Sequence, residues 1–216
     1  MDAPPDLIAA LPCLPLFPLP EVVLLPGARL PLHVFEPRYR VMLERCMATH
    51  RALAVVQLLR GTDAQGLPRL ARLAGGGIIT EHHALADGRA NILVEGLARL
   101  ELEELAFEPP YRRARATVLH DAPGQLAEPD RRALLSAATT FARLVRGHDR
   151  SFSFHVDPAE PRLVELCAFQ LVVDAELRQS LLEEPSLAVR AQKVTEALMV
   201  QAATLGQQSG AGRDVN

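Results

Sequence analysis

The chain has 216 residues, of which 49% are hydrophobic and 23% charged, and its formal net charge is −3. This is enough apolar sequence for a buried core, and the acidic balance argues against a dedicated nucleic-acid-binding protein. The three cysteines are odd in number and far apart, which indicates a reducing compartment rather than a disulfide framework. Because the sequence shows neither a secretory signal pattern nor a membrane-length apolar run, we expect a soluble, cytoplasmic protein.

The first ordered segment is expected between Leu14 and Leu43, an apolar stretch divided by prolines. Proline lacks a backbone donor and fixes φ, so the pieces are typical of short extended segments near a sheet edge. Pro26-Gly27 predicts a turn, residues 30–35 predict a strand, and Pro37 suits the first position of a helix. The apolar residues that follow recur on one helical face: Tyr39, Met42, Leu43 and Cys46.

Further strands are predicted between residues 52 and 120. Residues 52–59 are apolar and rich in β-branched side chains, as in a buried strand. Asp87-Gly88 lies between two extended runs and predicts a two-residue hairpin turn in which both central residues have φ > 0. From 92 to 102 apolar and polar residues alternate, as in a half-buried strand, and Gly96 marks a bulge or a bend. Residues 112–120 predict one more strand.

After the Pro/Gly-containing segment 121–128 the apolar period changes from two residues to 3.6. Three helices are expected: one over 134–145, a second over 163–181, and a third from Pro185-Ser186 onward. We therefore predict an α+β protein with a small, mostly antiparallel β pseudo-barrel followed by a helical bundle. The predicted division is a flexible tail (1–10), the β domain with one helix (11–122), the bundle (123–206) and a disordered tail (207–216).

Residues 30–39, LPLHVFEPRY, resemble the opening of the Lon protease amino-terminal domain, the Lon substrate-binding domain family. The resemblance covers about residues 11–206. Its other matching elements are Leu14–Leu19, Pro26-Gly27, Asp87-Gly88-Arg89, Gly96 and Pro110-Tyr111. This chain departs from the family at Gly75–Gly77, where Gly-Thr is common, which leaves the local register open and favours a more mobile loop.

The resemblance implies a PUA-like barrel and a non-catalytic, proteolysis-related role in protein binding. The chain would recognise unfolded or exposed apolar polypeptide segments, or dock a protein partner, as a stand-alone protein without the ATPase and peptidase domains. No cofactor is implied, and the partner and the oligomeric state stay open. We expect Phe17 to lie in the core, and the same expectation applies to Phe35. The candidate polypeptide-contact residues of the opening block are Phe35, Tyr39 and Met42.

Catalytic and metal motifs are missing from the sequence. It contains no G-x-x-x-x-G-K-[ST] loop, and its one lysine, Lys193, lies two helical turns (about 10 Å) from Ser186. Such a separation does not make a Ser-Lys dyad, so we expect no enzyme activity. His82 and His83 are adjacent on a predicted strand and would point to opposite faces, so we expect no metal site.

Three alternative functions stay open. A basic patch beside Tyr111 could bind RNA, and its members are Arg112, Arg113 and Arg115. We favour cross-strand pairing of these arginines with nearby carboxylates, because the chain is acidic overall. The candidate carboxylates are Glu101, Glu103 and Glu104. A small-molecule or adaptor module is the second alternative, and a cryptic hydrolase is the third and least favoured.

Overall fold

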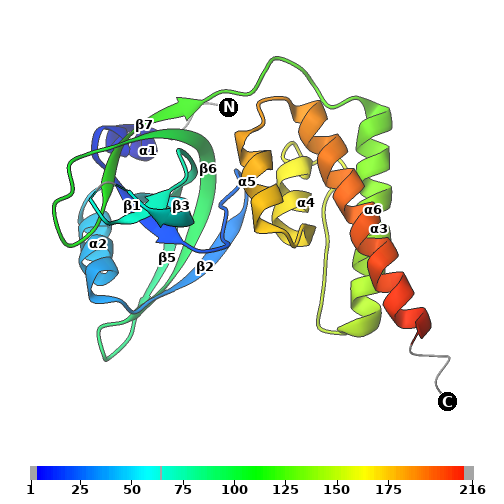
Figure 1. Ribbon diagram of the computed structural model, residues 1–216, viewed down its shortest axis with the longest axis horizontal. Coiled ribbons are helices and arrows are strands. Elements are labelled where there is room, and N and C mark those ends of the chain that lie inside the picture. Colours follow the sequence, from blue (N-terminus) through cyan, green and yellow to red (C-terminus); the bar gives the residue numbers. More distant parts are fainter. Residues whose placement is uncertain (1–3, 64, 212–216) are drawn as a thin grey trace. The chain divides into compact units, whose positions relative to one another are not determined.

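The computed structural model describes residues 4–63 and 65–211, although of residues 208–211 it describes only the backbone. The chain divides into two compact units, Met1–His120 and Asp121–Asn216, which we call the β unit and the helical unit (Figure 1). Within the described ranges, no helix has both the length and the apolar character that crossing a membrane would require.

Five strands of the β unit close into a barrel (Figure 1). In order around the barrel they are β1 (Leu14–Leu19), β7 (Arg113–Leu119), β6 (Ala90–Glu104), β5 (Leu73–Ala84) and β3 (Ala52–Thr62). The ring closes where β1 pairs in parallel with β3, and the other pairings around it are antiparallel. Two strands lie outside the ring: β2 (Arg29–Val34) pairs with β6, and β4 (Pro68–Leu70) pairs with β3. The predicted mostly antiparallel pseudo-barrel is confirmed.

The barrel interior is narrow and filled by small and medium apolar side chains. They alternate along each strand, as the two-residue period of a half-buried strand requires. These side chains are Leu14, Leu16, Ala52, Ala54, Val56, Ala74, Ala98, Leu100, Leu102, Ala114 and Ala116.

Residues 5–10 belong to this core, and their assignment to a flexible tail is wrong. They form helix α1 (Pro5–Ala10), with a proline at its start, and a short 3-10 turn follows at Leu11–Cys13. Leu7 and Ala10 are buried in the barrel cluster, and their burial stabilises a helix too short to be stable in isolation. Residues 1–3 lie outside the described part of the chain.

The triple glycine lies inside strand β5, not in a loop. A Cβ atom at Gly75 would lie 1.8 Å from the backbone oxygen of Leu24, because residues 24–25 pass directly over the sheet. The glycines therefore permit a close backbone approach, and the expected mobile loop is wrong. The register between β5 and β6 shifts after Gly76, since Ala98 faces Gly76 while Gly96 faces Gly77. The shift leaves Leu97 without a partner in β5, so of the bulge or bend expected at Gly96 the structure has a bulge at the next residue.

The hairpin between β5 and β6 is present, but its turn differs from the predicted two-residue type. The Gly88 N–H donates to the Leu85 oxygen over 3.0 Å, and Gly88 has a φ of 80° while Asp87 keeps a negative φ. The Asp87 carboxylate instead accepts from the Arg89 backbone N–H over 3.0 Å and stabilises the turn. Positive φ at Gly88 is thus confirmed, and positive φ at Asp87 is wrong.

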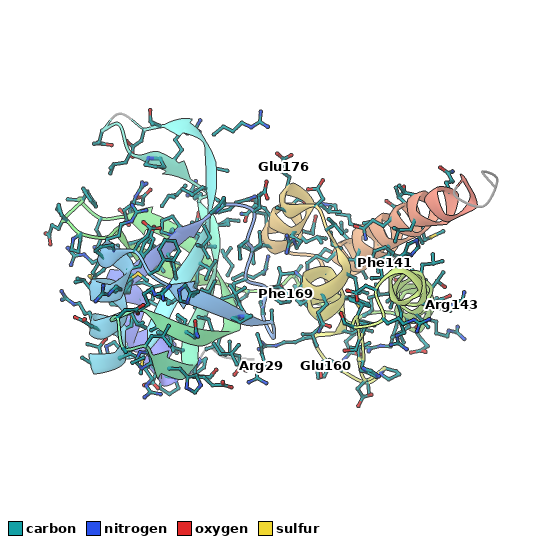
Figure 2. All side chains as sticks on the ribbon, turned by 90° about the horizontal axis from the view of Figure 1, so that it is seen from below. Arg29, Phe141, Arg143, Glu160, Phe169 and Glu176 are labelled. Atoms are coloured by element: carbon teal, nitrogen blue, oxygen red, sulfur yellow. The ribbon has the colours of Figure 1, made fainter. Side chains whose placement is uncertain are left out.

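Helix α2 (Pro37–Ala48) begins at Pro37, and its predicted apolar face is buried. In the helical unit, α3 (Glu128–His148) and α6 (Leu187–Ala211) lie side by side and run in the same direction (Figure 1). Phe141 points from α3 into the interior, whereas Arg143 lies on its exposed side (Figure 2). The unit's core includes Leu134, Ala138, Phe141, Leu163, Cys167, Leu171, Leu181, Ala191, Val194 and Leu198.

The single helix predicted over 163–181 is wrong, because the chain forms α4 (Leu163–Leu171) and α5 (Ala175–Glu183). The break follows from Asp174, whose carboxylate accepts from the Leu177 N–H over 3.0 Å and caps a new helix. The last helix, α6, continues through Ala211, where a disordered tail from residue 207 was expected. The rest of that predicted tail, residues 212–216, lies outside the described residues.

A buried arginine joins the elements of the helical unit. Arg190 of α6 is 3% exposed and donates to both carboxylate oxygens of Asp121, each over 2.9 Å. It also donates to the Glu165 carboxylate of α4 over 2.8 Å and to the Glu184 carbonyl over 2.7 Å. One side chain therefore connects the start of the unit, α4 and the α5–α6 connection.

Candidate functional site

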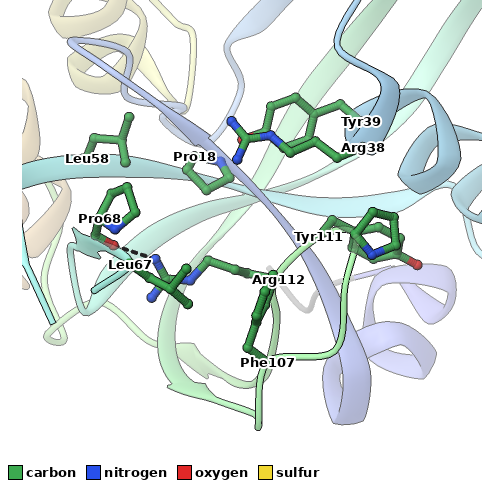
Figure 3. A pocket seen from close by; sticks show the side chains of 10 residues that line it. Pro18, Arg38, Tyr39, Leu58, Leu67, Pro68, Phe107, Tyr111 and Arg112 are labelled. Carbon is green, nitrogen blue, oxygen red and sulfur yellow. Dashed lines mark hydrogen bonds between the residues drawn. The ribbon is translucent and has the colours of Figure 1, made fainter. Parts of the chain in front are cut away.

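The β unit carries an apolar pocket of about 100 Å³. Four chain segments form it: β1, the start of α2, the β3–β4 hairpin and the connection between β6 and β7 (Figure 3). We call it the apolar pocket, and its lining residues are Pro18, Arg38, Tyr39, Leu58, Leu67, Pro68, Phe107, Pro110, Tyr111 and Arg112. Prolines, leucines and aromatic rings dominate this lining, so the pocket suits an apolar group.

The α2 wall of the apolar pocket is a packed stack. The Tyr39 ring lies 4.5 Å from the Phe17 ring, centroid to centroid, and the Arg38 guanidinium lies over the Tyr39 ring at 4.5 Å. Arg38 also pairs with Glu36 over 2.8 Å, which holds its planar group in place. Burial raises the pKa of the Tyr39 hydroxyl, so this wall stays neutral apart from the guanidinium.

The opposite wall comes from residues 105–112. Phe107 is 45% exposed at this wall, although it is a large apolar side chain. Arg112 is only 12% exposed and donates to Glu104 over 2.8 Å and to the Pro68 carbonyl. Because Arg112 links the β3–β4 hairpin to β6, it acts as a brace for the pocket and not as a free cation.

The three predicted contact residues, Phe35, Tyr39 and Met42, lie in different environments in the structure. Tyr39 lines the apolar pocket, whereas Met42 is 1% exposed and belongs to the core. Phe35 is 59% exposed and stacks on His33 at 6.0 Å, away from the pocket lining. The expected core position of Phe35 is wrong because Phe35 follows the last residue of β2, a strand outside the barrel. Phe17 is in the core, as expected.

Phe107 lines the apolar pocket but is not among the contact residues predicted from the sequence. The signal that could have identified it is an isolated aromatic residue in a segment of glutamates and prolines, where no period predicts a core position. An apolar side chain in such a connection belongs to no strand or helix that would bury it, so its exposure indicates a candidate contact residue.

The arginines of the basic patch are each paired with a carboxylate. Arg112 pairs with Glu104, and Arg113 with Glu108. Arg115 pairs with Glu103 over 3.0 Å, directly across β6 and β7. Glu101, the remaining predicted partner, pairs instead with Arg72 over 2.7 Å. Each of the three arginines therefore has a carboxylate partner, as the pairing interpretation predicts.

No catalytic or metal arrangement is found in the described residues. Lys193 Nζ lies 3.5 Å from Glu184, and the Ser180 hydroxyl donates to the Leu177 carbonyl over 2.9 Å. No three His, Cys, Asp or Glu side chains of the described ranges cluster as metal ligands would. The best-formed candidate site is thus a binding pocket.

The β unit is thus a barrel that carries an apolar pocket, and a helical unit follows it in the chain. The sequence matches the model of the ATP-dependent protease La (LON) substrate-binding domain over residues 13–200, and the chain belongs to this family. The resemblance inferred from residues 30–39 is confirmed.

Two relatives show how much of a Lon protease this chain covers. The Lon protease of Roseiflexus castenholzii is 30% identical over 118 residues, which are 55% of this chain and 14% of the relative. Lon protease 1 of Herpetosiphon aurantiacus is 26% identical over 206 residues, which are 90% of this chain and 24% of the relative. The chain thus spans a quarter or less of the length of these relatives.

Solved structures support the fold. A Lon N-terminal domain protein from Xanthomonas campestris matches with a TM-score of 0.61 and 23% identity, over 84% of this chain and 96% of that one. The N-terminal domain of the Mycobacterium avium complex Lon protease matches with a TM-score of 0.60 and 14% identity, over 88% and 98%.

Proposed function

We propose that this chain is a non-catalytic polypeptide-binding module whose apolar pocket receives one side chain of an unfolded segment. The observation that carries the proposal is the half-exposed Phe107 at the wall of a pocket lined by leucines, prolines and tyrosines. Membership of the Lon substrate-binding domain family supports the same conclusion.

The pocket's size favours a single aliphatic side chain. An apolar cavity of about 150 Å³ holds benzene, and this pocket measures about 100 Å³. Burying one such side chain yields about 1.5–3 kcal/mol before the costs of association, so one pocket alone binds weakly. Weak binding through one side chain suits unfolded chains, which expose apolar groups that folded proteins bury.

The test is a titration of fluorescent, unfolded apolar peptides, followed by anisotropy. Leu58 lines the apolar pocket, while its neighbour Leu59 is 39% exposed and does not, so the two form a matched pair. We expect Leu58→Ala and Phe107→Ala to weaken binding about tenfold and Leu59→Ala to leave it unchanged. Phe35→Ala, the same change at a second exposed phenylalanine, serves as the control for Phe107→Ala and tests the contact predicted from the sequence.

Salt and RNA separate this proposal from the basic-patch alternative. Apolar binding should persist in high salt, whereas phosphate contacts through arginines would weaken steeply. The purified chain should also neither hydrolyse ATP nor cleave unfolded casein. Salt-sensitive binding of RNA together with a failure to bind any peptide would overturn the proposal.

A further inference from the structure

A second pocket of about 190 Å³ lies on the β unit, and two arginines stand among alanines and prolines in its lining. Arg45, His50 and Arg113 line it, and among its described lining residues none is acidic. The other polar groups of the lining are the Thr49 hydroxyl, the Tyr111 hydroxyl and the Cys13 thiol. We call it the cationic pocket.

The two arginines reach the cationic pocket from different elements. Arg45 lies in the last turn of α2, while His50 follows the end of that helix. Arg113 opens β7, and its Nη1 lies 3.5 Å from the sulfur of Cys13. Arg113 also pairs with Glu108, whose carboxylate is 73% exposed and therefore replaceable by a ligand.

The cationic pocket and the apolar pocket are neighbours. Tyr111 lines both of them, and so does α2, through Tyr39 in one and Arg45 in the other. Six residues of helix separate these two positions, which is about 9 Å along the axis. An extended polypeptide rises about 3.3 Å per residue, so a segment needs about three residues or more to pass from one pocket to the other.

We propose that the cationic pocket binds a carboxylate of the same polypeptide whose apolar side chain occupies the apolar pocket. This inference rests on the proposed function and names its substrate class: segments with a carboxylate about three residues from an apolar side chain. The carboxylate is that of a glutamate or aspartate, or the free C-terminus of the chain. Guanidinium groups suit it because charge-assisted hydrogen bonds to carboxylates are stronger than neutral ones.

Matched peptides test the inference. One series keeps the apolar anchor and places Glu, Gln or Lys three residues away; another compares a free C-terminal acid with its amide. We expect the Glu peptide or the free-acid peptide to bind about tenfold more tightly than its neutral counterpart. Arg45→Gln should abolish this preference without changing the affinity for the neutral peptide. Glu108→Gln should increase the preference, because it removes the carboxylate that already pairs with Arg113.

Cys13 supplies a second measurement that needs no peptide. It is exposed, whereas Cys46 and Cys167 are buried, so small thiol reagents report on this pocket. We expect an anionic methanethiosulfonate to react with Cys13 several-fold faster than a cationic one, and Arg45→Gln to reduce that ratio. Arg45→Lys, which keeps the charge, should preserve the ratio and controls for damage to the fold.

The outcomes distinguish the two proposals. Equal affinity for acidic and neutral peptides, with Leu58→Ala still weakening both, would overturn the carboxylate site and leave the polypeptide-binding function intact. If no peptide binds, the proposed function fails, and equal rates for the two thiol reagents would then overturn the cationic pocket as well.

Discussion

Replacing Gly96 by alanine is the sharpest test of how the β unit is packed. Gly96 lies in β6 beneath the segment that passes over the sheet, and an added Cβ would lie 2.2 Å from the Leu25 oxygen. Ordinary contact begins near 3.4 Å, so the Leu25 oxygen must retreat by about 1.2 Å. Leu25 is buried, and its segment is held by hydrogen bonds from Gly27 N to Gly96 O (2.7 Å) and from Gly96 N to Ala28 O (2.8 Å).

The loss of stability follows from two effects, the steric overlap with the Leu25 oxygen and the weakening of these hydrogen bonds. Overpacking a rigid site costs about 1–3 kcal/mol, and each hydrogen bond that is lost costs about 0.5–1.5 kcal/mol. We therefore expect Gly96→Ala to lower the free energy of unfolding of the β unit by about 2–4 kcal/mol. For a domain of this size the melting midpoint should fall by about 10–20 °C.

Tyrosine fluorescence is a selective assay for this change. The chain has no tryptophan, and its two tyrosines, Tyr39 and Tyr111, are both buried in the β unit. The matched control is Gly147→Ala in α3, where an added Cβ meets nothing within 4 Å. That change should stabilise the helix by up to about 1 kcal/mol and leave the tyrosine signal unchanged. An unaltered midpoint for Gly96→Ala would refute the argument that glycine is required there.

Three further perturbations test other parts of the fold. Arg190→Met should lower the free energy of unfolding of the helical unit by about 3–5 kcal/mol, because it leaves Glu165 buried without its partner. Lys193→Met should lower it by less than about 1 kcal/mol. Unfolding is followed by far-UV circular dichroism, and similar losses for the two variants would contradict the role of Arg190. Gly88→Val should lower the free energy of unfolding of the β unit by about 1–2 kcal/mol, because valine is strained at the positive φ of this position, and Gly88→Asn should lower it less. Equal melting midpoints for the parent and both variants would argue against this turn. Burial raises the pKa of the Cys46 thiol from 9.0 to about 12, so its protonated form stabilises the fold below pH 9, and that stability is lost by about 1.4 kcal/mol per pH unit between pH 9 and 12. Urea unfolding of Cys46→Val should lack this part of the alkaline loss, and identical alkaline curves for parent and variant would disprove it.

The sequence by itself determined the order and the kind of the elements. Apolar residues recur every second position before residue 120 and at helical spacing after it, and this period is a property of neighbours along the chain. Pro37 and Gly88 were interpreted correctly for the same reason, since a helix start and a positive φ are local requirements. The run at residues 30–39 was long enough to indicate the family that the comparison shows.

Only the tertiary structure decided which residues form the candidate sites. The apolar pocket joins Pro18, Leu58 and Phe107, which are separated by about forty or more residues each, and no local pattern relates such positions. Exposure of Phe35 depends on β2 lying outside the ring, and the need for glycine at Gly75 depends on a distant segment crossing the sheet. Hydrophobic periodicity and turn preferences depend on residues close in sequence. A pocket, in contrast, is made by contacts between distant residues, which form only once the barrel has closed.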